Sequence, residues 1–284
     1  MIKDYLKTGR AELSVLALSF IVLGLTYMDV LPTVGQMILM PVSVSLASMW
    51  TYAFNNVTDI NEDSINKPNS AIISGRKSAS EILIFSLVCA LLSFISAYMV
   101  SKAVFASICL IIIGGFFYSY KLFGSIRLKE IFIVKNITIS LLWALVPLMP
   151  LLAFGFTAPS TYMIIIFFVF IQCFISTVMS DLKDAEGDEL TGVKTFPSVY
   201  GLRRTLLFLT ALNTIGLLSI VAGWLLLNLK SYLLILSIVN ISRYYAFFLI
   251  GSGIKSASYT YSKIDIPTLT TFGLLALIGR LLIH

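Results

Sequence analysis

The sequence predicts an all-α protein that crosses a membrane nine times. Of its 284 residues, 58% are hydrophobic and only 12% are charged, and its mean hydropathy is +0.95. A typical soluble domain carries about 25% charged residues, roughly twice this share. Since each helical crossing needs about 20 apolar residues, the chain has room for nine crossings and their loops. This composition excludes a water-soluble globular protein.

The apolar runs between charged residues, glycines and prolines define the expected helices. The run at 82–120 is divided at Ser101 and Lys102, because about forty apolar residues are too many for one crossing and suit a hairpin. The first run follows Lys3, Lys7 and Arg10 and is too long for a cleavable signal peptide, so we expect an uncleaved anchor. The expected spans are residues 13–30, 35–57, 82–101, 103–120, 131–153, 161–180, 205–227, 231–252 and 265–283.

The basic residues are unevenly distributed between the two sides of the membrane. Fifteen of the 20 Lys and Arg residues fall on the side that holds the N-terminus, whereas the loops of the other side hold only Lys102 and Lys230. By the positive-inside rule, the richer side is cytoplasmic, and the chain is expected in the cell membrane. The net charge of +6 therefore marks orientation, and no nucleic-acid partner is expected.

Histidine and cysteine chemistry is unavailable to this chain. The single histidine, His284, is the last residue, which excludes histidine-based zinc sites and Ser-His-Asp triads. Cys89, Cys109 and Cys173 are isolated within apolar runs, so neither a disulfide framework nor a paired-cysteine metal site is expected. Any chemistry must come from carboxylates, amides or basic groups.

Eight of the 14 acidic residues fall in two short segments on the predicted cytoplasmic side, at residues 55–63 and 181–188 and just beyond. Residues spaced by three or four positions share one face of a helix. The polar residues with this spacing are Asn55, Asp59 and Asp63 in the first segment, and Asp181, Asp184 and Asp188 in the second. Asp59 and Asp184 are separated by 125 positions, and so are Asp63 and Asp188, which indicates an internal repeat.

These two acidic faces predict a magnesium site. Carboxylates stacked at a membrane boundary repel one another and are costly to desolvate, so they favour bound cations. Oxygen ligands without histidine or thiolate favour Mg²⁺, which binds through carboxylates and substrate phosphates. The candidate metal ligands are Asn55, Asp59, Asp63, Asp181, Asp184 and Asp188. The alternative is that these are solvated loop charges that cap helices.

Basic side chains near the two segments are candidates for binding phosphate. Lys67 follows the first segment, while Lys183 and Lys194 flank the aspartates of the second. Arg243 lies in the middle of the eighth span, where it either contacts an acceptor head group or forms a structural salt bridge. Gln172, in the sixth span, is expected to hydrogen-bond to another helix.

The two acidic segments resemble the aspartate-rich motifs of the UbiA superfamily of intramembrane prenyltransferases. Residues 55–63 read Asn-Asn-Val-Thr-Asp-Ile-Asn-Glu-Asp and resemble the first motif, NDxxDxxxD; residues 181–188, continued through 192–201, resemble the second. Residues 63–69 and 74–78 are most similar to the branch that contains digeranylgeranylglyceryl phosphate synthase and chlorophyll synthase. The chain departs from the usual pattern at Asn56, Ser70, Ala71 and Ile73.

The resemblance implies one transmembrane domain over residues 1–284, with helices around a central cavity and Mg²⁺ joining both motifs to a prenyl diphosphate. By position, it implies catalytic or metal-binding roles for Asn55, Asp59, Asp63, Asp184 and Asp188, supported by Asp181, and diphosphate contacts for Lys183 and Lys194. It also implies substrate contacts for Arg10 and Asn136.

The expected activity is transfer of a prenyl group, geranylgeranyl or longer, from its diphosphate to a lipid precursor or an aromatic acceptor, with release of diphosphate. Metal ions and lysines stabilise such a leaving group, and aromatic rings such as Tyr118 can face the allylic cation. One alternative is a terpene cyclase of the same architecture, which needs no acceptor. A divalent-cation transporter is disfavoured, because its acidic residues would lie near the bilayer midplane.

Overall fold

The computed structural model describes residues 2–28, 32–60, 63–64, 69–121, 127–155 and 159–283. These ranges contain helices, turns and loops but no strand, which confirms the all-α class. Seven of the described helices are long and apolar enough to cross a membrane, and two bent helix pairs could each provide one more. The chain is therefore a multi-pass membrane protein, and the nine expected spans are compatible with the structure.

The chain divides into two compact units. Unit 1 comprises Met1–Leu18, Val30–Lys129 and Leu152–Phe154, and unit 2 comprises Ser19–Asp29, Glu130–Leu151 and Gly155–His284. The first acidic motif belongs to unit 1 and the second to unit 2.

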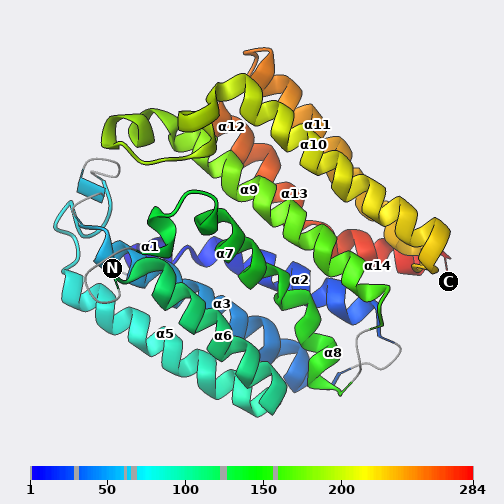
Figure 1. Cartoon of the computed structure of the whole chain (residues 1–284). Coiled ribbons are helices and arrows are strands. Elements are labelled where there is room, and N and C mark those ends of the chain that lie inside the picture. The colour runs from blue at the N-terminus through cyan, green and yellow to red at the C-terminus, as the bar shows by residue number, and fades with distance from the viewer. Residues whose placement is uncertain are drawn as a thin grey trace. The chain divides into compact units, whose positions relative to one another are not determined.

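Unit 1 is built on three long helices that all contact one another (Figure 1). They are α3 (Val34–Thr58), α5 (Ala79–Val100) and α6 (Lys102–Ser119), preceded by α1 (Ile2–Thr8) and the 3-10 turn η1 (Ala11–Leu13). Thr33 and Ser78 begin α3 and α5 with capping boxes. Ser101 ends α5 and caps α6, which confirms the hairpin predicted at this position.

The parallel helices α3 and α6 approach closely at Gly115. A Cβ atom at this position would lie 2.8 Å from Thr51 Oγ1 and 3.0 Å from the ring of Trp50. One turn further along both helices, Ser119 Oγ donates a hydrogen bond of 3.0 Å to Asn55 Oδ1. The missing side chain at Gly115 therefore lets α6 reach the first acidic motif.

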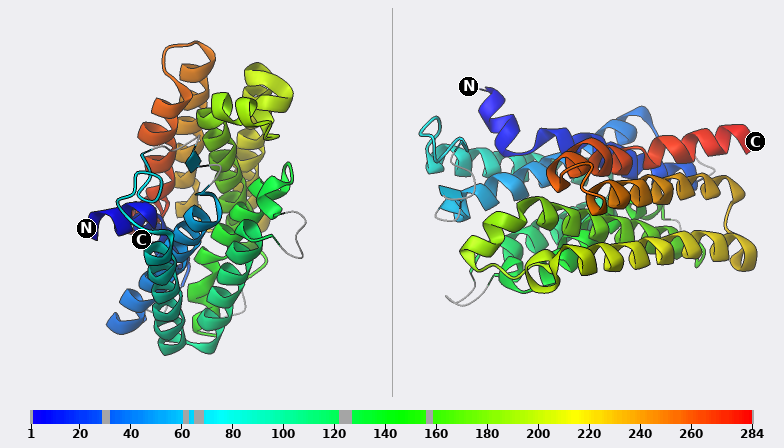
Figure 2. Two further views of the ribbon diagram at one scale, coloured as in Figure 1. Left: turned by 90° about the vertical axis from the view of Figure 1, so that its left-hand side faces the viewer. Right: turned by 90° about the horizontal axis from the view of Figure 1, so that it is seen from above.

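Unit 2 is built on α9 (Tyr162–Thr191) and α10 (Phe196–Leu227), with α7 (Val134–Ala144) packed on α9 and α11 (Ser237–Gly251) packed on α10 (Figure 2). Ile175, Met179, Leu209 and Ala246 are fully buried in its core. The remaining elements are α2 (Ser14–Thr26), η3 (Leu128–Glu130), η4 (Val146–Leu148), α8 (Met149–Ala153), η5 (Ser231–Leu236), α12 (Ala257–Thr260), the π-helical turn η6 (Tyr261–Asp265), α13 (Ile266–Thr270) and α14 (Phe272–Ile283); α2, α8 and η3 each have residues in both units.

The turn between α9 and α10 explains the glycine, threonine and proline that follow the second motif. Gly192 has a φ of 71°, which favours glycine, and Val193 N donates to Asp188 O at 2.9 Å, so the chain reverses directly after α9. Thr195 then begins α10 with a capping box, and Pro197 stands in the first turn. Gly201, with φ 75° and ψ 166°, bends α10 after its first turn.

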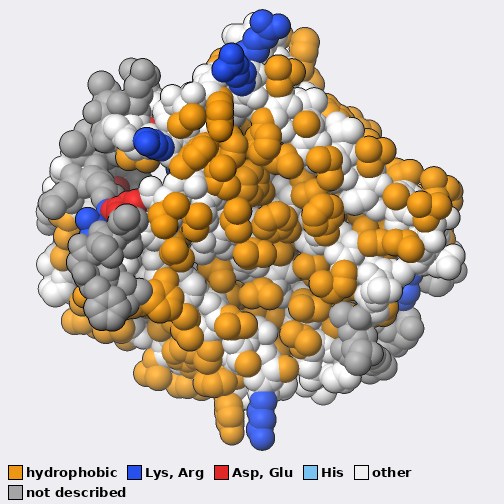
Figure 3. Space-filling view, viewed as in Figure 1, with side chains coloured by type: hydrophobic (Ala, Val, Ile, Leu, Met, Phe, Trp, Pro, Cys, Tyr) orange, Lys and Arg blue, Asp and Glu red, His pale blue; other side chains and the backbone are white. Residues whose placement is uncertain are grey.

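Two predicted spans begin too late. Helix α10 starts at Phe196, nine residues before the predicted start at 205. The polar segment that precedes the apolar run is capped by Thr195 and is helical on both sides of the bend at Gly201. The last span is likewise preceded by α12 and η6, and a 43° bend separates Ala257–Thr270 from Phe272–Ile283. On the face drawn in Figure 3, hydrophobic side chains are spread across the visible surface, and the few visible charged groups lie toward its edge, as expected for contact with lipid.

Candidate functional site

The first motif occupies the C-terminal end of α3. Asn55 Nδ2 donates a hydrogen bond of 2.7 Å to Asp59 Oδ2, one turn further along. Asp59 is the C-cap residue of the helix, and Asp63 N donates to Asp59 O at 2.7 Å. Asp59 and Asp63 are 5% and 4% exposed. The structure therefore brings Asn55, Asp59 and Asp63 to one end of unit 1, as the spacing predicts.

Two basic residues that follow α6 neutralise Asp59. Arg127 Nη1 lies 3.0 Å from Asp59 Oδ1, and Lys129 Nζ contacts the same oxygen. Both belong to the fifteen basic residues of the predicted cytoplasmic side, to which the sequence assigns only the membrane orientation. The signal that could have identified them is topological: α3 and α6 are parallel, so residues just after α6 lie level with the end of α3.

Asn56 holds the N-terminal helix to α3. Its Nδ2 donates hydrogen bonds to Tyr52 O, at 2.7 Å, and to Thr8 O, at 3.3 Å. An aspartate, which is usual at this motif position, is acceptor-only when ionised and could make neither bond. In the same region the guanidinium of Arg10 lies 4.8 Å from the centre of the Tyr52 ring. The departure at Asn56 therefore has a structural role next to a predicted substrate contact.

The second motif starts with a buried ion pair between α7 and α9. Lys135 Nζ lies 2.7 Å from Asp181 Oδ1, and Asn136 Nδ2 donates to Asp181 Oδ2 at 3.2 Å and to Thr177 Oγ1 at 3.1 Å. Asn136 is 1% exposed and its Oδ1 has no hydrogen-bond partner among the described residues. The structure thus joins Asn136 to the acidic motif. The sequence did not identify Lys135 as a partner of the motif. The free-energy cost of placing a lysine inside a membrane span, here next to Asn136, is the signal that could have identified it.

The remaining aspartates of the second motif follow on the same helix. Lys183 Nζ lies 3.4 Å from Asp184 Oδ1 and 5.3 Å from the centre of the Tyr261 ring. Asp188 is half-buried, and its pKa is raised to about 6 because burial disfavours the charged form and because Asp181 and Asp184 repel it, while Lys135 acts in the opposite direction. The three aspartates of the second motif therefore share one negative environment.

The donors of both motifs suit Mg²⁺. Within the described parts of the chain, no three acidic, cysteine or histidine side chains converge on one point. Mg²⁺ does not need such a cage, since it typically takes one or two carboxylates from the protein and completes its coordination with water and substrate phosphates. A divalent cation would also relieve the repulsion that Asp181 and Asp184 exert on Asp188.

Lys194, Tyr118 and Lys67 are further site residues that the sequence predicts. Lys194 is exposed in the turn beside Thr195, and Tyr118 is half-buried on α6. Lys67 lies outside the described residues. Phe116, two positions before Tyr118, belongs to an aromatic cluster of unit 1. Its ring stacks on that of Phe54, with the two centroids 5.8 Å apart.

Arg243 forms a buried salt bridge, which is one of the two roles that the sequence left open for it. It is fully buried, and Nη1 contacts Asp265 Oδ1 while Nη2 donates to Gln172 O at 3.1 Å. Ser176 Oγ contacts the other oxygen of Asp265. Gln172 Nε2 also donates to Asn213 Oδ1 on α10, at 3.4 Å, as expected for a polar residue between helices. Contact between Arg243 and an acceptor stays a prediction, and it would require access to a side chain that is buried here.

Comparison with known proteins gives the same picture. Digeranylgeranylglyceryl phosphate synthase of Methanopyrus kandleri is 27% identical over 229 residues, which cover 78% of this chain and 81% of that protein. The enzyme of the same name from Methanosphaera stadtmanae is 26% identical over 80% of this chain and 82% of its own length. A UbiA homologue from Archaeoglobus fulgidus, solved with bound GPP and Mg²⁺, shares the fold with a TM-score of 0.77 at 18% identity, over 98% of this chain and 99% of that one. A model of the UbiA prenyltransferase family matches residues 15–260, and the chain belongs to this family of membrane-embedded prenyltransferases.

Proposed function

We propose that this enzyme transfers a prenyl group, geranylgeranyl or longer, from its diphosphate to a lipophilic acceptor in a Mg²⁺-dependent reaction that releases diphosphate. One observation carries the proposal: the end of α9 holds three mutually repelling aspartates beside Lys135 and Lys183. Such a site suits a divalent cation together with an anionic substrate. Relatives named digeranylgeranylglyceryl phosphate synthase favour a lipid-precursor acceptor, and an aromatic acceptor is the second candidate.

The aspartates are the proposed metal ligands. In unit 1 these are Asp59 and Asp63, with Asn55 orienting Asp59; in unit 2 they are Asp184 and Asp188, with Asp181 behind them. When bound, Mg²⁺ would neutralise the negative charge that develops on the departing diphosphate. The pairing of Asp59 with Arg127 and Lys129 holds this carboxylate in position at the end of α3.

The basic residues are the proposed diphosphate contacts. Lys183 is held between Asp184 and Tyr261, so its ammonium is positioned next to a proposed metal ligand. Lys194 is exposed on the turn after the motif and can reach an anion without losing another partner among the described residues. Arg10, Lys67, Asn136 and Tyr118 remain proposed substrate contacts. We further propose that residues 1–284 act as one domain in the cell membrane, with the active site facing the cytoplasm.

The test uses the purified full chain with Mg²⁺ and geranylgeranyl diphosphate, with and without candidate acceptors. Asp59→Asn and Asp184→Asn should each lose at least about 100-fold in turnover, since even the partners of metal ligands typically contribute about 10–100-fold. Asp4→Asn is the matched control, because Asp4 pairs with Arg76 outside both motifs and its loss should leave turnover unchanged. Full activity of both motif variants would contradict the proposal.

Further outcomes separate the alternatives. A prenylated product that forms only with an acceptor excludes a cyclase, whereas a cyclic product without acceptor supports it. If both motifs serve one substrate, the double variant should be little worse than either single variant, because residues that act as a unit are not additive. Mg²⁺ uptake into vesicles without diphosphate release would favour a transporter.

A further inference from the structure

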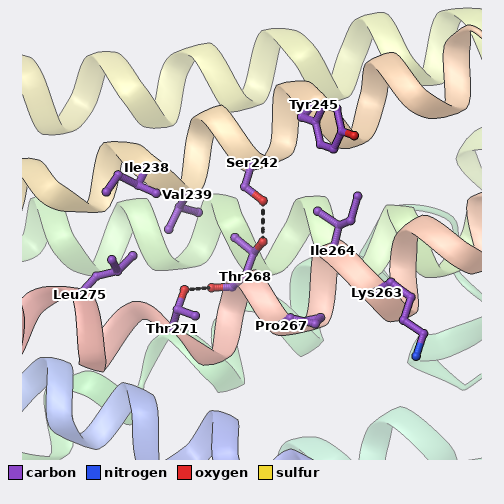
Figure 4. A pocket seen from close by; sticks show the side chains of 10 residues that line it. All are labelled: Ile238, Val239, Ser242, Tyr245, Lys263, Ile264, Pro267, Thr268, Thr271 and Leu275. Atoms are coloured by element: carbon purple, nitrogen blue, oxygen red, sulfur yellow. Dashed lines mark hydrogen bonds between the residues drawn. The ribbon is translucent and has the colours of Figure 1, made fainter.

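Unit 2 carries a groove on its surface that the catalytic proposal does not use. It is open, has a volume of about 390 Å³ and lies between α11 on one side and η6, α13 and α14 on the other (Figure 4). Ile238 and Tyr245 on its rim are 49% and 57% exposed. The volume is within the range of about 300–1,000 Å³ that is usual for ligand pockets.

The groove exists because the chain between α12 and α14 is not a straight helix. The π-helical turn η6 widens the backbone, Pro267 follows in the first turn of α13, and the axis bends by 43° before α14. These breaks move α13 and α14 away from α11 along part of their length. Ser242 on α11 and Thr268 on α13 bridge the gap, with their hydroxyl oxygens 2.7 Å apart.

The groove offers a mainly apolar surface, because the hydroxyl groups in its lining are already hydrogen-bonded within the protein. The Ser242 and Thr268 hydroxyls are bonded to each other, and Thr271 Oγ1 donates to Thr268 O at 2.7 Å, so the polar groups on the floor are satisfied internally (Figure 4). The aliphatic residues of the lining are Ile238, Val239, Ile264, Pro267 and Leu275. An occupant of this groove therefore needs a hydrocarbon chain.

A single cation stands at one end. Lys263 is exposed, and within the described part of the chain its ammonium has no hydrogen bond or ion pair. Its stem lines the groove while the ammonium points away from the apolar walls, as lysines at membrane surfaces do (Figure 4). None of the ten lining residues is acidic, so the groove cannot hold the metal ions that a diphosphate requires.

We propose that this groove binds an anionic phospholipid of the surrounding bilayer, with one chain along α11 and α13 and its phosphate at Lys263. One lysine complements the single negative charge of a phosphodiester. Lys263 is two residues from Tyr261, which contacts Lys183, so the head group would sit level with the second acidic motif. The site is separate from the proposed diphosphate contacts.

The test measures lipid binding to the purified full chain by native mass spectrometry, with phosphatidylglycerol and phosphatidylcholine of identical chains as probes. We expect phosphatidylglycerol to bind roughly fivefold more tightly, the effect of about one lysine near an anionic phosphate. Lys263→Gln should remove this preference. Lys255→Gln is the matched control, since Lys255 is exposed over the Tyr259 ring, does not line the groove and should not alter the preference.

A second variant tests whether the hydrocarbon chain of the lipid lies in the groove. Leu275→Trp narrows the groove and should weaken binding of both lipids without changing their ratio. Unchanged preference in Lys263→Gln, an equal loss in Lys255→Gln, or unchanged binding in Leu275→Trp would each overturn the proposal. An unaltered thermal unfolding midpoint shows that each variant is folded, and none of these readouts depends on prenyl transfer.

Discussion

The ammonium group of Lys135 lies 2.7 Å from Asp181 Oδ1, and Asn136, the next residue in sequence, donates to the other oxygen. One turn of α7 thus binds both oxygens of the first aspartate in the second motif. Both partners of the ion pair are largely buried, so the carboxylate depends on this turn for its charge compensation.

Replacing Lys135 should therefore destabilise the protein. Lys135→Met leaves a buried carboxylate without its cation, which typically costs about 3 kcal/mol when a buried pair is broken. Thermal unfolding in detergent would report this as a lower midpoint. The double variant Lys135→Met with Asp181→Leu should recover most of the midpoint, because both charges are then absent. A single variant as stable as the parent would show that the pair contributes nothing.

Asn56→Asp restores the usual first motif and should weaken the attachment of α1. The new carboxylate cannot donate to Tyr52 O and Thr8 O, and it repels both carbonyl oxygens. Both hydrogen bonds are part-buried, and a typical intramolecular hydrogen bond contributes about 0.5–1.5 kcal/mol to stability. Hydrogen exchange of residues 2–8 should become faster. Asn69→Asp, in an exposed turn, adds the same charge and should leave that exchange unchanged; equal protection in Asn56→Asp would contradict the tether.

Mg²⁺ binding should strengthen as pH rises through about 6, the pKa of Asp188. Below that pH the carboxyl is protonated, so a proton competes with the metal. The stability of the metal-free protein should change with pH in the opposite direction. Because the pKa of Asp188 is raised above its ordinary value of 3.8, the folded state binds more protons than the unfolded state. The folded state therefore loses stability as pH rises from about 4 to 6. The Mg²⁺ concentration for half-maximal activity, measured from pH 5.5 to 7.5, checks this. Asp188→Asn should flatten the dependence, and an unchanged pH profile in that variant would exclude Asp188 as its source.

The role of Arg243 can be separated from that of a substrate contact. Arg243→Met alone leaves Asp265 buried and uncompensated, and we expect a loss of about 3–5 kcal/mol. Arg243→Met combined with Asp265→Leu removes both charges and should fold. If the pair is structural, the double variant retains the parent KM for the acceptor. A KM raised tenfold or more in a folded double variant would instead show that Arg243 contacts the acceptor.

Helix positions and the acidic faces could be predicted because they depend on local periodicity. The hairpin at Ser101, the pairing of Asn55 with Asp59 and the polar contact of Gln172 all follow from apolar run length or residue spacing. The early start of α10 could not, since its first turn is polar and forms because Thr195 caps it. Residue spacing identified helical segments but missed the bend at Gly201.

The partners of the aspartates could not be predicted from spacing alone. Arg127 and Lys129 reach Asp59 only because Gly115 lets α6 lie against α3, and a sequence without tertiary contacts assigns them to orientation. Asp265 is 22 positions from Arg243 and reaches it from a π-helical turn, for which the chain offers no periodic signal.

The length of α9 links the enzyme to the thickness of its membrane. Its 30 residues make a rod of about 45 Å, whereas the hydrocarbon layer is about 30 Å thick, so roughly ten residues stand clear of it. The second motif, at the C-terminal end of α9, therefore belongs to the part of the helix that extends beyond the hydrocarbon layer. A bilayer of lipids with longer chains would bring Asp181 and Lys135 closer to the hydrocarbon layer. The energetic penalty of this mismatch would therefore fall on the aspartates of the second motif, which precede the turn at Gly192.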